Sequence, residues 1–213
     1  MTIFIKLFVV VQLLVIAWRW DVNGLGGVVW FVGLIILHIL RTPFVNMTKA
    51  NIVVESYESK VERVLMFSLW LGMFLIPVVQ LITGVLAFSQ YDLPFWMVLL
   101  GVVCFTSGIW LFWRSHIDLG KNWSVTLELH EDHSLITSGV YKKVRHPMYS
   151  SIWLIALSQP LLVHNWIAGF ATIIIFSITC LIRLPIEEKM MYEKFGTAYE
   201  KYCRKTGRLI PRF

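Results

Sequence analysis

The sequence predicts an all-α, polytopic membrane protein with about six transmembrane helices, a C-terminal helical hairpin and a small cytoplasmic cap. The first observation is composition: of 213 residues, 57% are hydrophobic and only 15% are charged, and the mean hydropathy is +0.70. A soluble domain carries about 25% charged residues, so an ordinary soluble enzyme and a disordered chain are both excluded. The other two observations are several apolar runs of membrane-spanning length and the uneven placement of basic residues between them.

The apolar runs define the expected spans in chain order. A short first run, Phe4–Trp18, is interpreted as a span rather than a signal peptide, because no small-residue cleavage motif follows it. The last two runs are separated only by His164-Asn165, which predicts a tight helical hairpin; they are Ile152–Val163 and Trp166–Ile182. Between these ends lie three clear runs without acidic or basic side chains, namely Gly24–Leu40, Val64–Phe88 and Phe95–Trp113.

Lysine and arginine gather in alternate connections. Segment 41–63 contains four of them, segment 114–151 contains five, and the tail from Arg183 contains eight. Six spans with both termini in the cytoplasm place all three segments on the cytoplasmic side, as the positive-inside rule requires. The net charge of +6 is therefore ascribed to anionic lipid headgroups, and no nucleic-acid partner is expected.

The spans hold almost no ionisable side chains, which argues against an ion pump or a proton relay. Polar residues instead concentrate in segments 114–151 and 183–213. Neither segment contains a glycine-rich phosphate-binding motif, a zinc-protease motif or a serine-hydrolase motif. The three cysteines are scattered and form no CxxC pair, so no disulfide framework and no metal site are predicted.

The first polar block opens with DLGKNWS (Asp118–Ser124), and apolar residues then alternate up to position 129, which predicts a short strand or extended segment. The block closes with RHPMY. Because Pro147 favours the first turn of a helix, His146 and Tyr149 are expected at a helix entrance, where backbone N–H groups are open. Taken alone, this cluster is best interpreted as an interfacial anchor.

The second polar block follows the last apolar run. Arg183 and Glu187 are four residues apart, so they share a helix face if the helix continues past Pro185. A surface ion pair between the two is the alternative interpretation. The aromatic residues Tyr199 and Tyr202 predict an interfacial helix, for which a plain membrane anchor is an equal explanation.

Three motifs in order carry a family resemblance: DLGKNWS, HSLITSGVYKKVRHPMY and RLPIEEKMMYEKFGTAYEKYCRKTGRLIP, with the apolar hairpin between the last two. Over roughly residues 64–213 the chain resembles the isoprenylcysteine carboxyl methyltransferase family, and more broadly the membrane methyltransferases that include phospholipid N-methyltransferases. The resemblance implies one domain over 1–213, with a generic helical pair and loop in 1–63 and a catalytic core in 64–213. It also implies that the cytoplasmic cap binds S-adenosyl-L-methionine, and that the acceptor is a lipidic or prenylated small molecule or protein.

The resemblance also implies residue roles. Arg183 matches the arginine that meets the acceptor. Glu128 matches with a change, since the eukaryotic enzymes have glutamine there, and Ser151 stands where the family frequently has glycine. The implied cofactor contacts are Glu128, His133, Ser134, Leu135, Ile136, Tyr141, His146, Pro147, Met148, Tyr149 and Glu187.

The implied reaction is methylation of a carboxylate that is already ionised near pH 7 and needs no general base. An arginine suits this acceptor, because its planar guanidinium can bind both carboxylate oxygens. Three alternatives stay open. Phospholipid (ethanolamine) N-methylation would need a base, for which Glu188 is the candidate; an NADPH-dependent sterol-type reductase shares the RHP-tyrosine and tail pattern; and a non-enzymatic membrane protein could keep an inactive site. The sequence does not indicate an oligomeric state.

Overall fold

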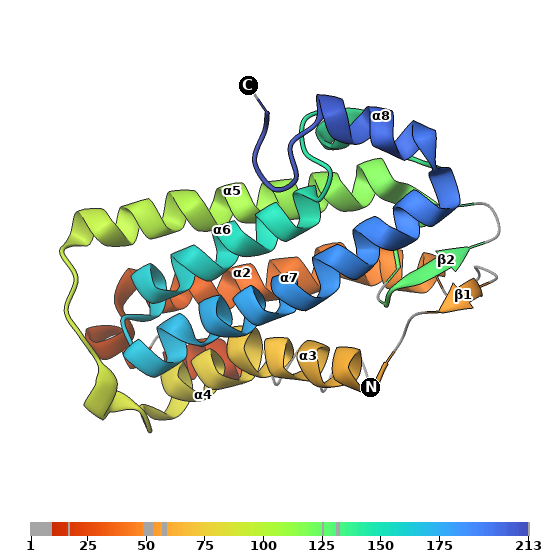
Figure 1. Cartoon of the computed structure of the whole chain (residues 1–213). Coiled ribbons are helices and arrows are strands. Elements are labelled where there is room, and N and C mark those ends of the chain that lie inside the picture. Colours follow the sequence, from red (N-terminus) through yellow and green to blue (C-terminus); the bar gives the residue numbers. More distant parts are fainter. Residues whose placement is uncertain are drawn as a thin grey trace.

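The computed structural model describes residues 10–16, 18–48, 53–56, 59–124, 126–130 and 133–212. Long helices lie side by side, and a two-stranded sheet and a short helix gather at one end of the bundle (Figure 1). The longer elements are α2 (Trp20–Thr48), α3 (Lys60–Trp70), α4 (Ile76–Thr83), α5 (Phe95–Leu119), α6 (Pro147–Val163), α7 (Trp166–Phe195) and α8 (Thr197–Lys205), with strands β1 (Val53–Ser56) and β2 (Glu128–His130). Short helical turns are η1 (Leu71–Leu75), η2 (Ala87–Ser89), η3 (Gly120–Asn122) and η4 (Gly139–Lys142).

Four described segments are helical, long and apolar enough to cross a membrane: Trp20–Thr48, Lys60–Thr83, Phe95–Asn122 and Trp166–Phe195. The helix α6 is also apolar but shorter, with 17 residues. The structure therefore confirms an all-α polytopic membrane protein. The count of six spans stays a prediction, because nearly half of the first expected run, Phe4–Trp18, lies outside the described residues.

The helix α6 packs against α5 and α7, and α2 packs against α5 and α6. In the core, the ring of Trp30 on α2 stacks on Phe105 of α5 with centroids 4.7 Å apart. A Cβ atom at Gly26 would lie 2.3 Å from the carbonyl oxygen of Leu162, so only glycine lets α2 approach α6 this closely. These contacts hold α2, α5 and α6 together as the centre of the bundle.

A single π-helical turn, η1, precedes Pro77 in the Lys60–Thr83 span. Here the N–H of Ile76 donates to the carbonyl of Leu71, five residues back. The next bond in that register would join position 77 to the carbonyl of Gly72, but proline has no N–H to donate. The side-chain amide of Gln159 on α6 donates to that carbonyl instead, at 3.0 Å. The proline therefore creates a buried polar contact between two spans.

The predicted hairpin is confirmed at the junction of α6 and α7. The helix α6 ends at His164 in the left-handed conformation, with φ of 50°, and Asn165 caps α7 by accepting a hydrogen bond from the backbone N–H of Ala168 at 2.8 Å. The helix α7 then continues through Pro185 to Phe195. It therefore extends beyond its apolar run and carries Arg183 and Glu187 on one continuous helix.

The expected extended segment is observed as the strand β2, which starts at Glu128 and pairs antiparallel with β1. In this pairing Ser56 lies opposite Glu128. The sheet lies at the end of the bundle where α2, α5 and α7 finish and where α3 and α6 begin (Figure 1). The three basic segments of the chain therefore meet at this one end.

Candidate functional site

A cavity of about 220 Å³ lies at the end of the bundle that carries the sheet. Eleven of the twelve predicted site residues line it: Glu128, His133, Ser134, Leu135, Ile136, Tyr141, His146, Met148, Tyr149, Arg183 and Glu187. Pro147 does not line the cavity. It occupies the first turn of α6, where its missing N–H leaves no hydrogen bond unmade.

The imidazole of His146 lies between two carboxylates. His146 caps the start of α6 and is buried. Its Nε2 lies 3.2 Å from Oε1 of Glu188, and its Nδ1 lies 3.8 Å from Oε1 of Glu187. Burial lowers the pKa of His146, but the hydrogen bonds and charges of Glu187 and Glu188 outweigh burial and raise it above its ordinary value. The imidazolium form is thus favoured.

Glu188 is the centre of a wider ion-pair cluster. Its Oε1 accepts from Nη2 of Arg145 at 3.0 Å and also pairs with Nε of Arg208 at 3.2 Å. With His146 this makes three cationic partners for one carboxylate. Such pairing stabilises the ionised form, and Glu188 does not line the cavity. The geometry therefore does not support Glu188 as the general base of an N-methylation.

The C-terminal tail closes over this cluster. The backbone N–H of Arg145 donates to the carbonyl of Gly207 at 2.8 Å, and the hydroxyl of Tyr202 donates to the carbonyl of Tyr141 at 2.6 Å. Tyr199 and Tyr202 on α8 are buried and line the cavity. Burial raises the pKa of Tyr202 to about 12, so it remains a neutral donor. The aromatic side of α8 thus faces the site, which a plain membrane anchor would not require.

The DLGKNWS motif positions the loop that follows it. The Oδ2 atom of Asp118 accepts from the N–H of Val140 at 2.9 Å, and Oδ1 of Asn122 accepts from the N–H of Ser134 at 2.8 Å. Through Asn122 the motif fixes the start of the Ser134–Ile136 segment at the cavity wall. The motif alone predicts no site role for Asn122, which lines the cavity.

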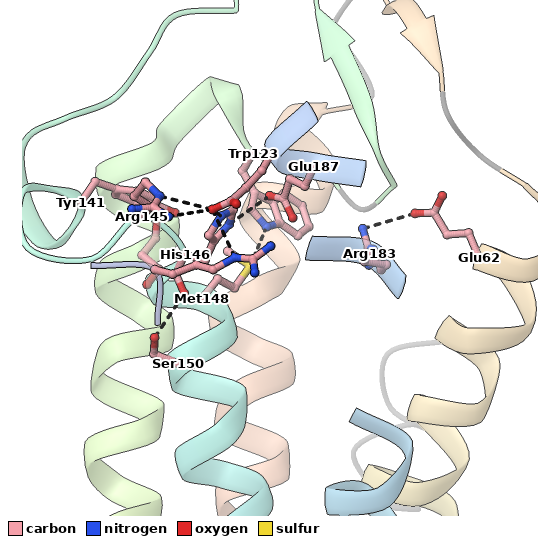
Figure 2. A network of polar contacts seen from close by, with 12 residues as sticks. Glu62, Trp123, Tyr141, Arg145, His146, Met148, Ser150, Arg183 and Glu187 are labelled. Carbon is pink, nitrogen blue, oxygen red and sulfur yellow. Dashed lines mark hydrogen bonds and ion pairs between the residues drawn. The ribbon is translucent and has the colours of Figure 1, made fainter. Parts of the chain in front are cut away.

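Arg183 and Glu187 both line the cavity, as their shared helix face predicts. The ion-pair partner of Arg183 is, however, Glu62 of α3, with Nη2 at 3.2 Å from Oε1. Figure 2 shows this pair apart from the polar cluster around His146. The Nη1 atom of Arg183 donates to the sulfur of Met66, a weak acceptor. The proposed ion pair between Arg183 and Glu187 is therefore not the arrangement observed.

Several buried polar atoms on the cavity wall have no hydrogen-bond partner within the described part of the chain. They include the hydroxyl of Tyr149, Oε2 of Glu187 and Nε of Arg183. Leaving such groups unpaired costs about 1–3 kcal/mol each, so a polar ligand is expected to satisfy them. A ligand with hydroxyl, ammonium and carboxylate groups matches these needs. S-adenosyl-L-methionine carries all three.

Part of the cavity wall is apolar. This part comes from α3, α6 and α7 at the depth of the predicted spans, through Met66, Leu69, Ile152 and Phe176. Phe176 is also stacked on Tyr149, with ring centroids 5.9 Å apart. The cavity therefore joins a polar region near the bundle end to an apolar region within the helices, which suits a ligand with a hydrocarbon part.

Comparisons with known proteins find relatives that match part of the chain. A sequence model of the isoprenylcysteine carboxyl methyltransferase family matches residues 97–193. The chain is 30% identical over 114 residues to a protein-S-isoprenylcysteine O-methyltransferase of Schizosaccharomyces pombe, a match that covers 53% of this chain and 48% of that enzyme. It is 25% identical over 139 residues to protein-S-isoprenylcysteine O-methyltransferase B of Arabidopsis thaliana, covering 64% of this chain and 71% of that enzyme.

The fold is similar to a solved structure described as the eukaryotic intramembrane Ras methyltransferase, isoprenylcysteine carboxyl methyltransferase, without a monobody. The TM-score is 0.60 at 19% sequence identity, and the superposition covers 96% of this chain and 74% of that one. At this identity the likeness concerns the fold. It reaches beyond residues 64–213, since it includes nearly the whole chain.

Proposed function

We propose that the chain belongs to the isoprenylcysteine carboxyl methyltransferase family, whose sequence model matches residues 97–193, and that it methylates the carboxylate of a lipidic, isoprenylcysteine-like acceptor. The family uses S-adenosyl-L-methionine as the methyl donor. The observation that carries the proposal is that Arg183 and Glu187 face one cavity from successive turns of α7, and that this cavity has both polar and apolar walls.

The polar region supplies the contacts that the donor needs. Glu187 offers the unpartnered Oε2 to hydroxyl or ammonium groups, and Tyr149 offers its unpartnered hydroxyl. The imidazolium of His146 keeps the carboxylate of Glu187 ionised while leaving this oxygen available. S-adenosyl-L-methionine, when bound, supplies a methyl group on a sulfonium centre. We propose that the residues around His133–Ile136, Tyr141 and Met148 complete this donor site.

On the acceptor side, the protein has little proton chemistry to perform. A carboxylate is ionised near pH 7, so its oxygen is already nucleophilic. What the residues must provide is orientation of the acceptor and exclusion of water. Arg183 can bind the carboxylate through its guanidinium, and Glu62 holds that guanidinium in place. Glu188 pairs with three cationic side chains, which is consistent with a reaction that needs no general base.

We propose that the acceptor enters from the bilayer and the donor from the cytoplasm. The apolar walls formed by Leu69, Ile152 and Phe176 suit an isoprenyl chain. The basic segments lie at the same end of the bundle as the polar region (Figure 1). By the positive-inside rule this end faces the cytoplasm. Prenylated proteins are the acceptors that such a site would serve.

The test uses the full chain in lipid nanodiscs with radiolabelled S-adenosyl-L-methionine. The acceptors are an S-isoprenylated N-acetylcysteine and, as a matched control, its N-methylamide, which keeps the lipid but has no carboxylate. We expect label in the free acid and none in the amide. Equal labelling of both compounds would contradict carboxyl methylation, and so would binding of the donor without transfer to any isoprenylated acid.

A further inference from the structure

A second arginine faces the same cavity from a helix outside the residues that the family model matches. Arg41 lies near the end of α2 and lines the cavity together with Arg183. Its side chain is exposed, which leaves the guanidinium accessible to a ligand. It forms no ion pair with a carboxylate anywhere in the described residues.

The position of Arg41 is set by an aromatic ring. Its guanidinium carbon lies 5.5 Å from the ring centre of Trp123, within the range of a cation–π contact. Trp123 is buried, and its indole N–H donates to the sulfur of Met148 at 3.3 Å. Arg41 is therefore linked through Trp123 to Met148 of the RHPMY segment.

The two arginines line the cavity together with the carboxylates of Glu128 and Glu187. The charges of Arg41 and Arg183 repel each other across it. The carboxylate of Glu62 already has two partners, because its Oε1 pairs with Arg183 and also accepts from the N–H of Leu127 at 3.1 Å. Like charges that face one cavity repel each other, so an anion that binds both arginines would relieve this repulsion.

We propose that Arg41 is a second acceptor-binding residue, which holds the acceptor carboxylate together with Arg183. The inference rests on the proposed function and adds to it the residue that makes the site selective for an anionic acceptor. Arg183 is already held by Glu62, whereas Arg41 contributes a guanidinium charge that no carboxylate of the described chain neutralises. The methyl donor also carries a carboxylate that Arg41 would attract, and the experiment distinguishes this carboxylate from that of the acceptor.

The experiment measures the dissociation constants of three compounds for the full chain in nanodiscs: the S-isoprenylated N-acetylcysteine, its N-methylamide and S-adenosyl-L-methionine. In the native protein the acid should bind more tightly than the amide. In Arg41→Gln the affinity for the acid should fall about tenfold. The affinities for the amide and the methyl donor should be unchanged. Arg41→Lys, which keeps the charge, should lose less than Arg41→Gln.

The control variant is Arg204→Gln, which removes an exposed arginine of α8 outside the cavity and should change none of the three constants. Retained donor affinity also shows that Arg41→Gln is folded. Unchanged acid affinity in Arg41→Gln would overturn the inference, as would a loss of donor affinity with acid preference intact. A native protein that binds the donor but does not distinguish acid from amide would contradict the proposed function itself.

Discussion

The guanidinium of Arg183 on α7 pairs with the carboxylate of Glu62 on α3, with Nη2 at 3.2 Å from Oε1, and both side chains are largely buried. The same carboxylate oxygen accepts from the N–H of Leu127 in the loop before β2. One acidic side chain thus connects α3, α7 and this loop at the cavity. Its effect is to fix the guanidinium that faces the acceptor.

The first prediction concerns the strength of this pair. In a double-mutant cycle with Glu62→Gln and Arg183→Gln, measured by thermal unfolding in detergent, we expect a coupling free energy of about 1–3 kcal/mol. The double variant should lose less stability than the sum of the two single-variant losses, because each single variant leaves one buried charge unpaired. The matched control is the exposed pair of Glu200 and Arg204 on α8, for which coupling of at most about 0.5 kcal/mol is expected. Equal coupling in the two cycles would contradict the role of Glu62.

The second prediction concerns the unpartnered hydroxyl of Tyr149. Tyr149→Phe removes only this oxygen, which lies near the carboxylate of Glu187 but makes no well-formed hydrogen bond in the described chain, so the unfolding temperature should fall little. The affinity for S-adenosyl-L-methionine, measured by calorimetry, should fall about five- to tenfold. Tyr91→Phe is the opposite control, because the Tyr91 hydroxyl donates to the carbonyl of Pro160 away from the cavity. It should lower stability and leave donor affinity intact. Unaltered donor affinity in Tyr149→Phe would remove this residue from the donor site.

The third prediction concerns pH. The pKa of His146 is raised in the folded protein, since the effect of Glu187 and Glu188 exceeds that of burial. Its stabilising contribution is therefore fully present below the ordinary histidine pKa of about 6.5 and is lost as the pH rises through the higher folded-state value. Unfolding temperatures measured from about pH 5 to about pH 9 should show this decline. His146→Gln should be less stable at the acidic end and should approach the native protein at the alkaline end. A constant difference across the range would contradict the shift.

The fourth prediction concerns topology. Asp92 lies in the exposed loop before α5, and Lys205 is an exposed residue at the end of α8. In a Cys203→Ser background, an impermeant maleimide added outside intact cells should label Asp92→Cys and should leave Lys205→Cys unlabelled. Both positions should react after the membrane is opened. Outside labelling of Lys205→Cys would reverse the orientation and contradict a cytoplasmic site.

Much of the fold follows from local patterns in the sequence. The uncharged runs predict the long helices, and His164-Asn165 predicts the hairpin because Asn165 can cap the next helix. Pro77 predicts an irregular helix. The form of that irregularity depends on Gln159, which approaches from α6 only after the helices have packed. Strand β1 has no such local signal, since it exists through its pairing with β2.

The site was predictable where its residues follow each other at helical or motif spacing. Arg183 and Glu187 share a face because they are four residues apart, and Pro147 places His146 at the start of α6. Glu62 and Arg41 could not be found in this way, because neither belongs to a motif: Arg41 lines the cavity from α2, and Glu62 reaches Arg183 from α3. Their charges matter through tertiary packing, which spacing along the chain does not encode.

The central claim is that Arg183 presents a carboxylate acceptor to the methyl donor, and the chemical form of the product tests it most directly. Nanodiscs containing both an isoprenylated cysteine and phosphatidylethanolamine are incubated with the labelled donor, and alkali is then added to release methanol from methyl esters. The native protein should give label that alkali releases, and Arg183→Lys should reduce this label about tenfold to a hundredfold at unchanged donor affinity, because lysine cannot bind both oxygens. Alkali-stable label in the lipid headgroup, or full ester formation by Arg183→Lys, would contradict the account.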